Sequence, residues 1–256
     1  YNGGTNWTVV SGSTPGTISG NGFATAIDGI ASMVVHQGML YIGTRKAAHA
    51  ELYRYAGNST WIDLNNNYSN TGTVCGSTAG TDVITAMASV DNRLYVATSK
   101  GNGQAALCIS NNDLNADGVT QITSTLGTFP VVADSNATGI TAVTQMIAYN
   151  GALYLALRKY GGGGDLVRYD IDTSSEDEGF SRIITTSGQI TSGGTASIDS
   201  ISSMAVYNGK LYIGTEKAGA AEIYRYVIGD AGSVGSVTWT KVSQATAGTI
   251  ASGGTS

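Results

Sequence analysis

Hydrophobic and polar residues alternate in four short segments that closely resemble one another. In each segment a Met lies eight residues before a Tyr, and this Tyr recurs every 54 to 59 residues. The four pairs are Met33 and Tyr41, Met87 and Tyr95, Met146 and Tyr154, and Met204 and Tyr212. Such alternation is typical of half-buried strands, and no stretch has a helical period long enough to compete. The chain therefore contains four copies of one structural unit.

Each unit is predicted to contain four antiparallel strands. A first strand, which carries the Met and is expected to pack it in the core, runs into a two-residue turn that favours a hairpin. The turns are Gln37-Gly38, Asp91-Asn92, Asn150-Gly151 and Asn208-Gly209. A second strand, a Gly/Ala-rich hairpin, a third strand and a fourth strand follow, as at 51–55 and 60–64. Four strands in 54 to 59 residues predict an all-β fold, a β-propeller of four-stranded antiparallel blades.

The blades are expected at 21–72, 73–128, 129–190 and 191–256 of a single propeller domain or segment. Residues 1–20 form a partial blade, because 1–7 align with 55–61 and predict an extra outer strand from Trp7 to Val10. One strand is thus left over. It indicates a segment of a longer array, a small propeller with a frayed strand, or a strand that pairs with a neighbouring molecule.

The blade pattern has Leu-Tyr-Ile-Gly-Thr in the second strand, Glu-Ile-Tyr-Arg-Tyr in the third and Trp in the fourth. It resembles the loosely kelch-like and tectonin-like blades of secreted bacterial repeat proteins. The Gly-Gly doublet of kelch blades is replaced here by Gly43-Thr44 and Gly214-Thr215, so no specific family and no family binding site is assigned. The resemblance implies a propeller located outside the cell or at its surface.

Composition excludes several classes of function. The 256-residue chain has 41% hydrophobic residues, too many for a disordered protein. Its net charge of −5 argues against binding to nucleic acid, which normally requires a basic surface. Its apolar runs are too short for membrane insertion.

Motifs for catalysis are missing from the sequence. It contains no Gly-x-Ser-x-Gly, His-Glu-x-x-His or phosphate-binding loop, and His36 and His49 do not recur in other blades. We therefore expect that the chain is not an enzyme. The expected function is that of a non-catalytic extracellular module, a structural or adhesive building block of a surface appendage, fibre or large repeat protein, with other copies of itself as partners. The alternative is a lectin-like propeller that binds cell-surface glycans on the face carrying the inter-blade linkers.

A Lys lies five residues after each repeated Tyr, at Lys46, Lys100, Lys159 and Lys217. Three of them face an acidic residue across the next hairpin: Lys46 faces Glu51, Lys159 faces Asp165, and Lys217 faces Glu222. This spacing predicts cross-strand ion pairs worth about 0–1 kcal/mol each. Lys100 faces Ala106 instead. A ring of lysines on one rim could therefore bind an anionic or carboxylate-bearing partner, which makes the four lysines the predicted binding residues.

Other candidate sites lie in loops. Residues 113–118 fit the first half of a calcium loop, with Asp113, Asn115 and Asp117 as oxygen ligands, although a plain acidic turn is the simpler account. Calcium is the cofactor that the sequence suggests. Cys75 and Cys108 could form a disulfide, which spacing alone leaves open. Four sequons could carry glycans, at Asn6, Asn58, Asn67 and Asn136.

Overall fold

The computed structural model describes residues 8–18, 26–64, 74–76, 80–101, 104–110, 119–123, 127–129, 139–159, 162–171, 179–184, 186–191, 193–228 and 237–250. These residues form four antiparallel blades, one for each sequence repeat, together with one short 3₁₀ turn at Val74–Gly76. No helix within these ranges is long and apolar enough to span a membrane.

The strands of each blade follow one another in chain order, and neighbours in the chain are neighbours in the sheet. Blade 1 comprises β1 (Gly29–His36), β2 (Met39–Arg45), β3 (Leu52–Gly57) and β4 (Thr60–Asp63), and blade 2 comprises β5 (Val83–Val90), β6 (Arg93–Ser99), β7 (Ala106–Ser110) and β8 (Val119–Gln121). Blade 3 comprises β9 (Ile140–Tyr149), β10 (Ala152–Lys159), β11 (Asp165–Asp170) and β12 (Phe180–Arg182), and blade 4 comprises β13 (Ser200–Tyr207), β14 (Lys210–Glu216), β15 (Ile223–Ile228) and β16 (Val237–Lys241). The predicted all-β propeller of four-stranded blades is confirmed.

The repeat extends to details of the backbone. The four predicted turns have positive φ at both central positions, as at Asn208 (48°) and Gly209 (66°), which suits the twist of a two-residue hairpin. Each first strand also has a register shift at the same repeat position, between Ile30 and Ser32 in blade 1 and at the counterparts of this position in the other blades. A bulge repeated in this way bends and twists every first strand alike.

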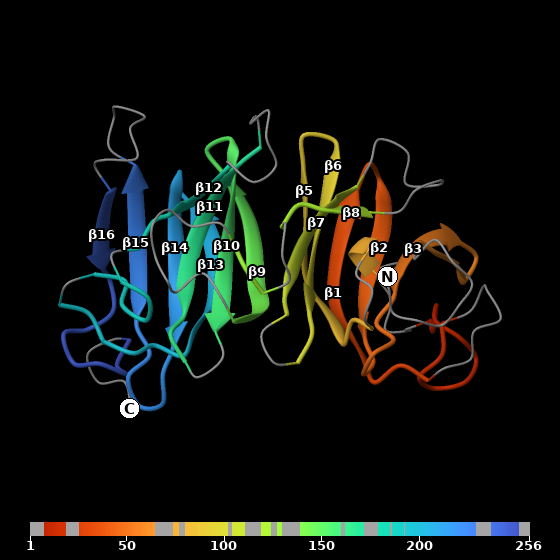
Figure 1. Cartoon of the computed structure of the whole chain (residues 1–256), viewed down its shortest axis with the longest axis horizontal. Helices are drawn as coiled ribbons and strands as arrows, with labels where there is room; N and C mark the ends of the chain where they lie inside the picture. Colours follow the sequence, from red (N-terminus) through yellow and green to blue (C-terminus); the bar gives the residue numbers. More distant parts are fainter. Residues whose placement is uncertain are drawn as a thin grey trace.

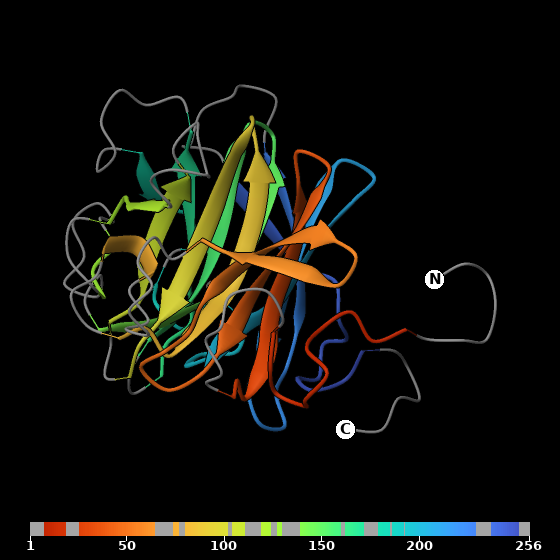
Figure 2. The ribbon, with the colours of Figure 1, turned by 90° about the vertical axis from the view of Figure 1, so that its right-hand side faces the viewer.

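The blades stand face to face in chain order (Figure 1). The first strands lie next to one another, β1 on β5, β5 on β9 and β9 on β13. No contact of comparable extent joins β1 with β13 among the described strands, and blades 1 and 4 lie at opposite ends of the longest axis. The four blades therefore form an open arc. Figure 2 looks onto the end made by blade 1.

The core lies between blades. The repeated Tyr41, Tyr95 and Tyr154 are fully buried there, where flat aromatic side chains fill most of the space between two sheets. Three of the four repeated methionines are also buried, as expected for core packing, whereas Met33 of blade 1 is exposed. The blade interfaces thus supply the hydrophobic stabilisation of the fold.

Two connections outside the sheets bear on the predictions. Of the extra N-terminal strand, Trp7 lies outside the described residues and Thr8–Val10 belong to no strand. The Val10 carbonyl oxygen instead accepts a hydrogen bond from the Trp61 indole of β4, at 2.8 Å. Cys75 and Cys108 are joined by a disulfide that ties the 3₁₀ turn to β7.

Candidate functional site

The repeated lysines do not pair with the acids across their hairpins as predicted. Lys46 Nζ lies 3.8 Å from Asp28, and Lys217 Nζ lies 3.5 Å from Asp199. Both aspartates come just before the first strand of the blade. The predicted Lys46–Glu51 and Lys217–Glu222 pairs are therefore wrong, because each lysine turns towards the inner strand of its blade and the glutamate turns into the core.

The acids of the third strands are buried and take other partners. Alternate residues of a strand share a face, so the hydroxyl of Tyr53 donates to Glu51, and that of Tyr224 donates to Glu222. Glu222 also accepts from Lys241. In blade 3 the corresponding Asp165 pairs with Arg182 of β12 at 3.1 Å and accepts from the Leu166 backbone N–H. These carboxylates stabilise individual blades.

Burial raises the pKa of Glu51 and of Asp165, in the second case despite the opposing charge of Arg182. Burial also acts to raise the pKa of Glu222, but hydrogen bonds from Lys241, Tyr224 and Thr195 outweigh it and lower that pKa to about 2. Glu222 is thus ionised in any ordinary buffer. These three acids are committed to the fold and leave the lysines of the rim to other partners.

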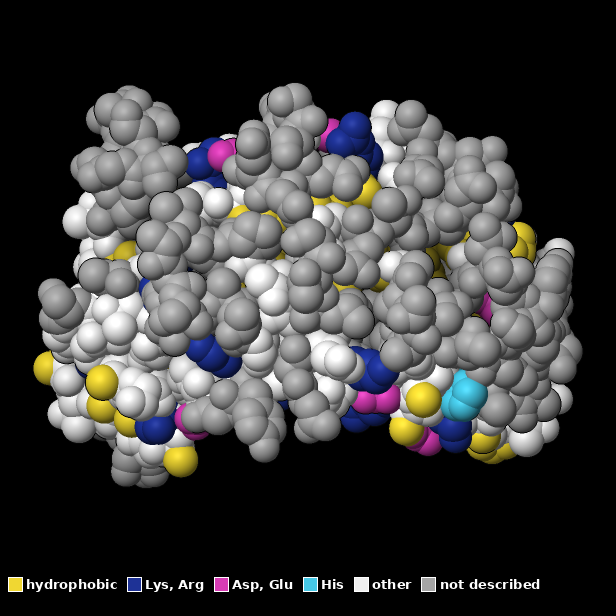
Figure 3. Space-filling model, in the orientation of Figure 1, with side chains coloured by type: hydrophobic (Ala, Val, Ile, Leu, Met, Phe, Trp, Pro, Cys, Tyr) yellow, Lys and Arg dark blue, Asp and Glu magenta, His cyan; other side chains and the backbone are white. Residues whose placement is uncertain are grey.

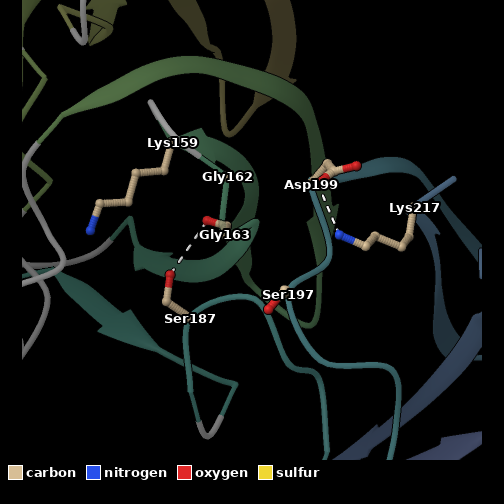
Figure 4. A pocket seen from close by; sticks show the side chains of 7 residues that line it. All are labelled: Lys159, Gly162, Gly163, Ser187, Ser197, Asp199 and Lys217. Carbon is tan, nitrogen blue, oxygen red and sulfur yellow. Dashed lines mark hydrogen bonds and ion pairs between the residues drawn. The ribbon is translucent and has the colours of Figure 1, made fainter.

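A pocket of about 360 Å³ lies between blades 3 and 4, on the rim where the hairpins and the inter-blade linker meet (Figure 4). Its lining residues come from the end of β10 and the next hairpin, from the linker, and from the ends of β13 and β14: Lys159, Gly162, Gly163, Ser187, Ser197, Asp199 and Lys217. Two of the four predicted lysines, one from each blade, therefore line one pocket.

Glycines of the β10–β11 hairpin make the wall of the pocket. Gly162 and Gly163 have φ of 92° and 99°, values that side chains rarely adopt. Backbone hydrogen bonds fix the linker to this hairpin, from Gly164 to Ile198 at 2.9 Å and from Gly188 to Gly164 at 2.8 Å. A Cβ on Gly163 would lie 3.3 Å from the Ser187 hydroxyl oxygen. The glycines thus leave the pocket free of side chains on this wall, and the hydrogen-bonded linker keeps the wall in place.

The junction of blades 1 and 2 is built differently at the corresponding place. Its hairpin carries Ala48, against which Gly80 of the linker packs so closely that a Cβ there would collide. Asp82, the counterpart of Asp199, accepts from the backbone N–H groups of Ala48 and Gly101 at 2.8 and 2.9 Å. Lys46 lies at this rim and Lys100 follows β6 of blade 2, and neither lines the pocket between blades 3 and 4.

The pocket presents hydrogen-bond donors and a net positive charge. Its ionisable side chains are the ammonium groups of Lys159 and Lys217 and the carboxylate of Asp199. In Figure 4 Lys217 points at Asp199, and Lys159 extends away from that pair on the other side of the glycines. The hydroxyl of Ser187 donates to the Gly163 carbonyl at 3.4 Å. This arrangement can bind an anionic group together with hydroxyl groups.

Sequence reasoning found Lys159 and Lys217 but missed Asp199. A signal was present, because an Asp lies five residues before the repeated Met in three of the four blades, at Asp28, Asp82 and Asp199. Ser187 and Ser197 belong to a linker without a repeat, so no pattern could single them out.

The other predicted sites mostly lie outside the described residues. This applies to Asp113, Asn115 and Asp117 of the calcium loop and to the sequons at Asn6, Asn67 and Asn136. Asn58 is described and lies exposed in the turn between β3 and β4. Within the described ranges no group of three or more His, Cys, Asp or Glu side chains is arranged to hold a metal ion.

The described surface is largely uncharged. Where Figure 3 draws described residues on this face, white polar side chains and backbone predominate, and the few basic and acidic side chains lie close together in small groups. This agrees with the low content of charged residues, 12%. A rim pocket with two lysines therefore stands out from its surroundings.

Neither a family model nor a curated protein matches this chain. Among solved structures, it is similar to GH43B of a xyloglucan PUL from Bacteroides ovatus, with 14% identity, a TM-score of 0.43, and coverage of 84% of this chain and 41% of that one. A family 43 arabinoxylan arabinofuranohydrolase from Bacillus subtilis gives 11% identity, a TM-score of 0.44, and coverage of 84% and 52%. A quinonprotein alcohol dehydrogenase-like protein from Bacteroides thetaiotaomicron gives 13% identity, a TM-score of 0.43, and coverage of 77% of this chain and 43% of that one. This chain spans about two fifths to one half of the length of these three proteins.

These similarities concern the fold alone, and they support a β-propeller without supporting the kelch-like or tectonin-like blade type. They contradict the expected function. Several of the similar structures are glycoside hydrolases of family 43. This finding contradicts the expected non-catalytic structural or adhesive module, its lectin-like alternative and the expectation that the chain is not an enzyme.

Proposed function

We propose that the chain binds a small carboxylate bearing hydroxyl groups in the pocket between blades 3 and 4. One observation carries this proposal: Lys159 and Lys217, which hold the same position in adjacent blades, line one pocket with a glycine wall. Its volume of about 360 Å³ falls at the lower end of the usual range for small-molecule sites.

The chemistry of the lining supports this class of ligand. A carboxylate gains charge-assisted hydrogen bonds from an ammonium group, and the hydroxyls of Ser187 and Ser197 can bind hydroxyl groups of the same molecule. Lys217 is already 3.5 Å from Asp199. A bound carboxylate would therefore share Lys217 with Asp199, which holds the lysine in place at the pocket.

We also propose that this binding takes place outside the cell. The disulfide between Cys75 and Cys108 supports that location, because such bonds persist in oxidising compartments.

The test is a titration of the protein with D-glucuronate, followed by two-dimensional amide NMR, with D-glucose as the uncharged control ligand. We expect glucuronate to shift amide signals of Gly162–Gly164 and of 186–199, and glucose to leave them unchanged. Lys217→Met should weaken the affinity at least tenfold. Spectra recorded over hours also report any chemical conversion of the ligand.

Lys46→Met is the matched control, because Lys46 forms the same kind of ion pair with Asp28 in blade 1. Its affinity should equal that of the wild type. Equal binding of glucose, equal losses in both variants, or signal shifts confined to another part of the molecule would each refute the proposal.

A further inference from the structure

The two ends of the arc expose faces that are buried everywhere else. Each blade has a leading face, which packs on the preceding blade, and a trailing face, which packs on the following one. On the leading faces the repeated Met87, Met146 and Met204 are 8%, 7% and 6% exposed. Met33, at the same position of blade 1, is 66% exposed. Ile30 is 44% exposed, whereas its counterpart Ile84 is completely buried.

The trailing face of blade 4 is incomplete in the same way. In blade 3 the trailing Tyr149 and Tyr154 are 7% and 0% exposed, and both rings pack on Tyr226 of blade 4, with centroids 6.2 and 5.9 Å apart. Their counterparts in blade 4 are Tyr207, which is 65% exposed, and Tyr212. These two rings contact each other at 6.3 Å. Among the described residues they lack the third aromatic ring that a following blade would supply.

We infer that the trailing face of blade 4 binds the leading face of blade 1 of a second copy of this chain, head to tail. The three junctions inside the chain show how this interface is built. Ile84 fits over Gly43, where a Cβ would collide with it, and its carbonyl accepts from the Ser32 hydroxyl at 2.8 Å. Across two copies, Ile30 takes the place of Ile84, with Gly214 and Ser203 as the counterparts of Gly43 and Ser32.

The remaining contacts have counterparts too. Tyr55 occupies in blade 1 the position of Tyr226, and each ring packs on the Trp of its fourth strand at 4.8 Å. Tyr55 of the second copy thus supplies the aromatic ring that Tyr207 and Tyr212 lack. Arg158 and Glu216 hold one repeat position and lie 3.5 Å apart across the junction of blades 3 and 4. Arg45 holds this position in blade 1, so the two end faces carry opposite charges there.

The chain's own N-terminal segment identifies the end of blade 4 as the partner. Trp239 donates to the Ile183 carbonyl at the end of the preceding blade, at 3.0 Å. Trp61 makes the same bond to Val10. Beyond Val10, Thr17 donates through its backbone and its hydroxyl to Thr14, and beyond Val242, Thr249 donates in the same two ways to Thr246.

Residues 10–17 therefore repeat the hydrogen bonds of 242–249, and they lie beside blade 1 (Figure 2, red). When blade 4 of a second copy docks on blade 1, residues 242–249 of that copy take the place of residues 10–17. Such a junction uses different surfaces on its two sides, so it can repeat from copy to copy.

The test is sedimentation velocity over a range of protein concentrations, with two variants that each remove one face. Met33→Asp damages only the leading face and Tyr207→Asp only the trailing face. We expect the mass of the wild type to rise above 26.2 kDa with concentration, and both variants to remain monomers. Both residues are exposed, and unchanged circular dichroism and thermal unfolding will verify that the variants fold.

Mixing the two variants gives the decisive result. Met33→Asp retains an intact trailing face and Tyr207→Asp an intact leading face, so the mixture should form dimers of one copy each and nothing larger. Val206→Asp is the control, since Val206 is exposed next to Tyr207 but lies on the other side of β13. It should associate like the wild type. A monomeric wild type at high concentration, or a mixture that stays monomeric, overturns the inference. So does association that survives in one variant alone, because it would show contact between identical faces.

Discussion

Glu222 accepts a hydrogen bond from Lys241, whereas Glu51, which holds the same position in blade 1, lies near the acidic Asp63. Asp63 pairs with Tyr53 at the register position that Lys241 takes opposite Tyr224. Burial and the neighbouring Asp63 together raise the pKa of Glu51, although the hydroxyl of Tyr53 opposes them. The residue at this position of the fourth strand, Asp63 or Lys241, thus helps to raise or to lower the pKa of the buried glutamate beside it.

Lys241→Met should destabilise the protein by about 3 kcal/mol, because it leaves the buried carboxylate of Glu222 without its cation. The aliphatic part of the side chain is preserved, so the loss reports the charge. Urea unfolding followed by tryptophan fluorescence measures it, since Trp239 lies on the same strand. The double variant Lys241→Met with Glu222→Gln should recover much of the loss. A single variant as stable as the wild type would show that the ion pair contributes nothing.

Glu222→Gln and Glu51→Gln should have opposite effects on stability at pH 7. The folded-state pKa of Glu222 lies near 2, below the ordinary value of 4.5, so its ionised form stabilises the fold above pH 4.5 and this stabilisation fades as the pH falls towards 2. The pKa of Glu51 is raised, so ionising it costs stability as the pH rises above 4.5. At pH 7 Glu222→Gln is therefore expected to lower the free energy of unfolding, and Glu51→Gln to raise it.

The comparison of pH 7 with pH 3 tests these signs by chemical denaturation. At pH 3 Glu51 is protonated in both states, so Glu51→Gln and the wild type should become equally stable. The stability gap between Glu222→Gln and the wild type should narrow without closing, because Glu222 becomes protonated in the unfolded state while most of it stays ionised in the folded state. If the free energy of unfolding depended on pH in the same way in all three proteins, the assigned directions of the two pKa shifts would be wrong.

The same strand position in blade 2 is stabilised by the disulfide. Cys108 of β7 occupies the place of Tyr53, and Ala106 the place of Glu51, so the hydrogen-bonded pair of blade 1 is replaced by a covalent bond to Cys75. The two cysteines are separated by 33 positions, for which loop closure predicts about 3 to 4 kcal/mol. Cys75→Ser with Cys108→Ser should lower the free energy of unfolding by that amount. Dithiothreitol should lower the free energy of unfolding of the wild type by the same amount and leave that of the double variant unchanged.

The sequence predicts the strands well because the repeat averages over four copies. A Met, a two-residue turn and a Tyr recur at fixed spacing in every blade, so a departure from Asn-Gly such as Asp91-Asn92 does not obscure the pattern. The side-chain partners could not be predicted in this way. Spacing placed Lys46 opposite Glu51 on adjacent strands, but it could not show that Tyr53, two residues further on, takes the carboxylate into the core.

The pocket escaped prediction for a related reason. It depends on a difference between junctions, with glycines at 161–164 where blade 1 has Ala48, and a search for repeated residues passes over differences. The function could not be predicted from the sequence either, because no local motif points to one. The residues that all four blades share determine the propeller scaffold, whereas residues that differ between blades determine the pocket.

Gly43→Ala and Gly214→Ala form the last matched pair, because these glycines share one repeat position on different sides of the arc. A Cβ on Gly43 would collide with Ile84 of the following blade, deep in the core, whereas a Cβ on Gly214 meets only the movable hydroxyl of Ser203. Gly43→Ala should cost about 2 kcal/mol, since a packed junction accepts an extra methyl group poorly. Gly214→Ala should change stability by no more than about 0.5 kcal/mol, because Ser203 can rotate and the lost backbone freedom of the unfolded chain compensates. Thermal unfolding of dilute protein measures both, and equal losses would show that the close approach of Ile84 to Gly43 does not limit the packing of blades 1 and 2.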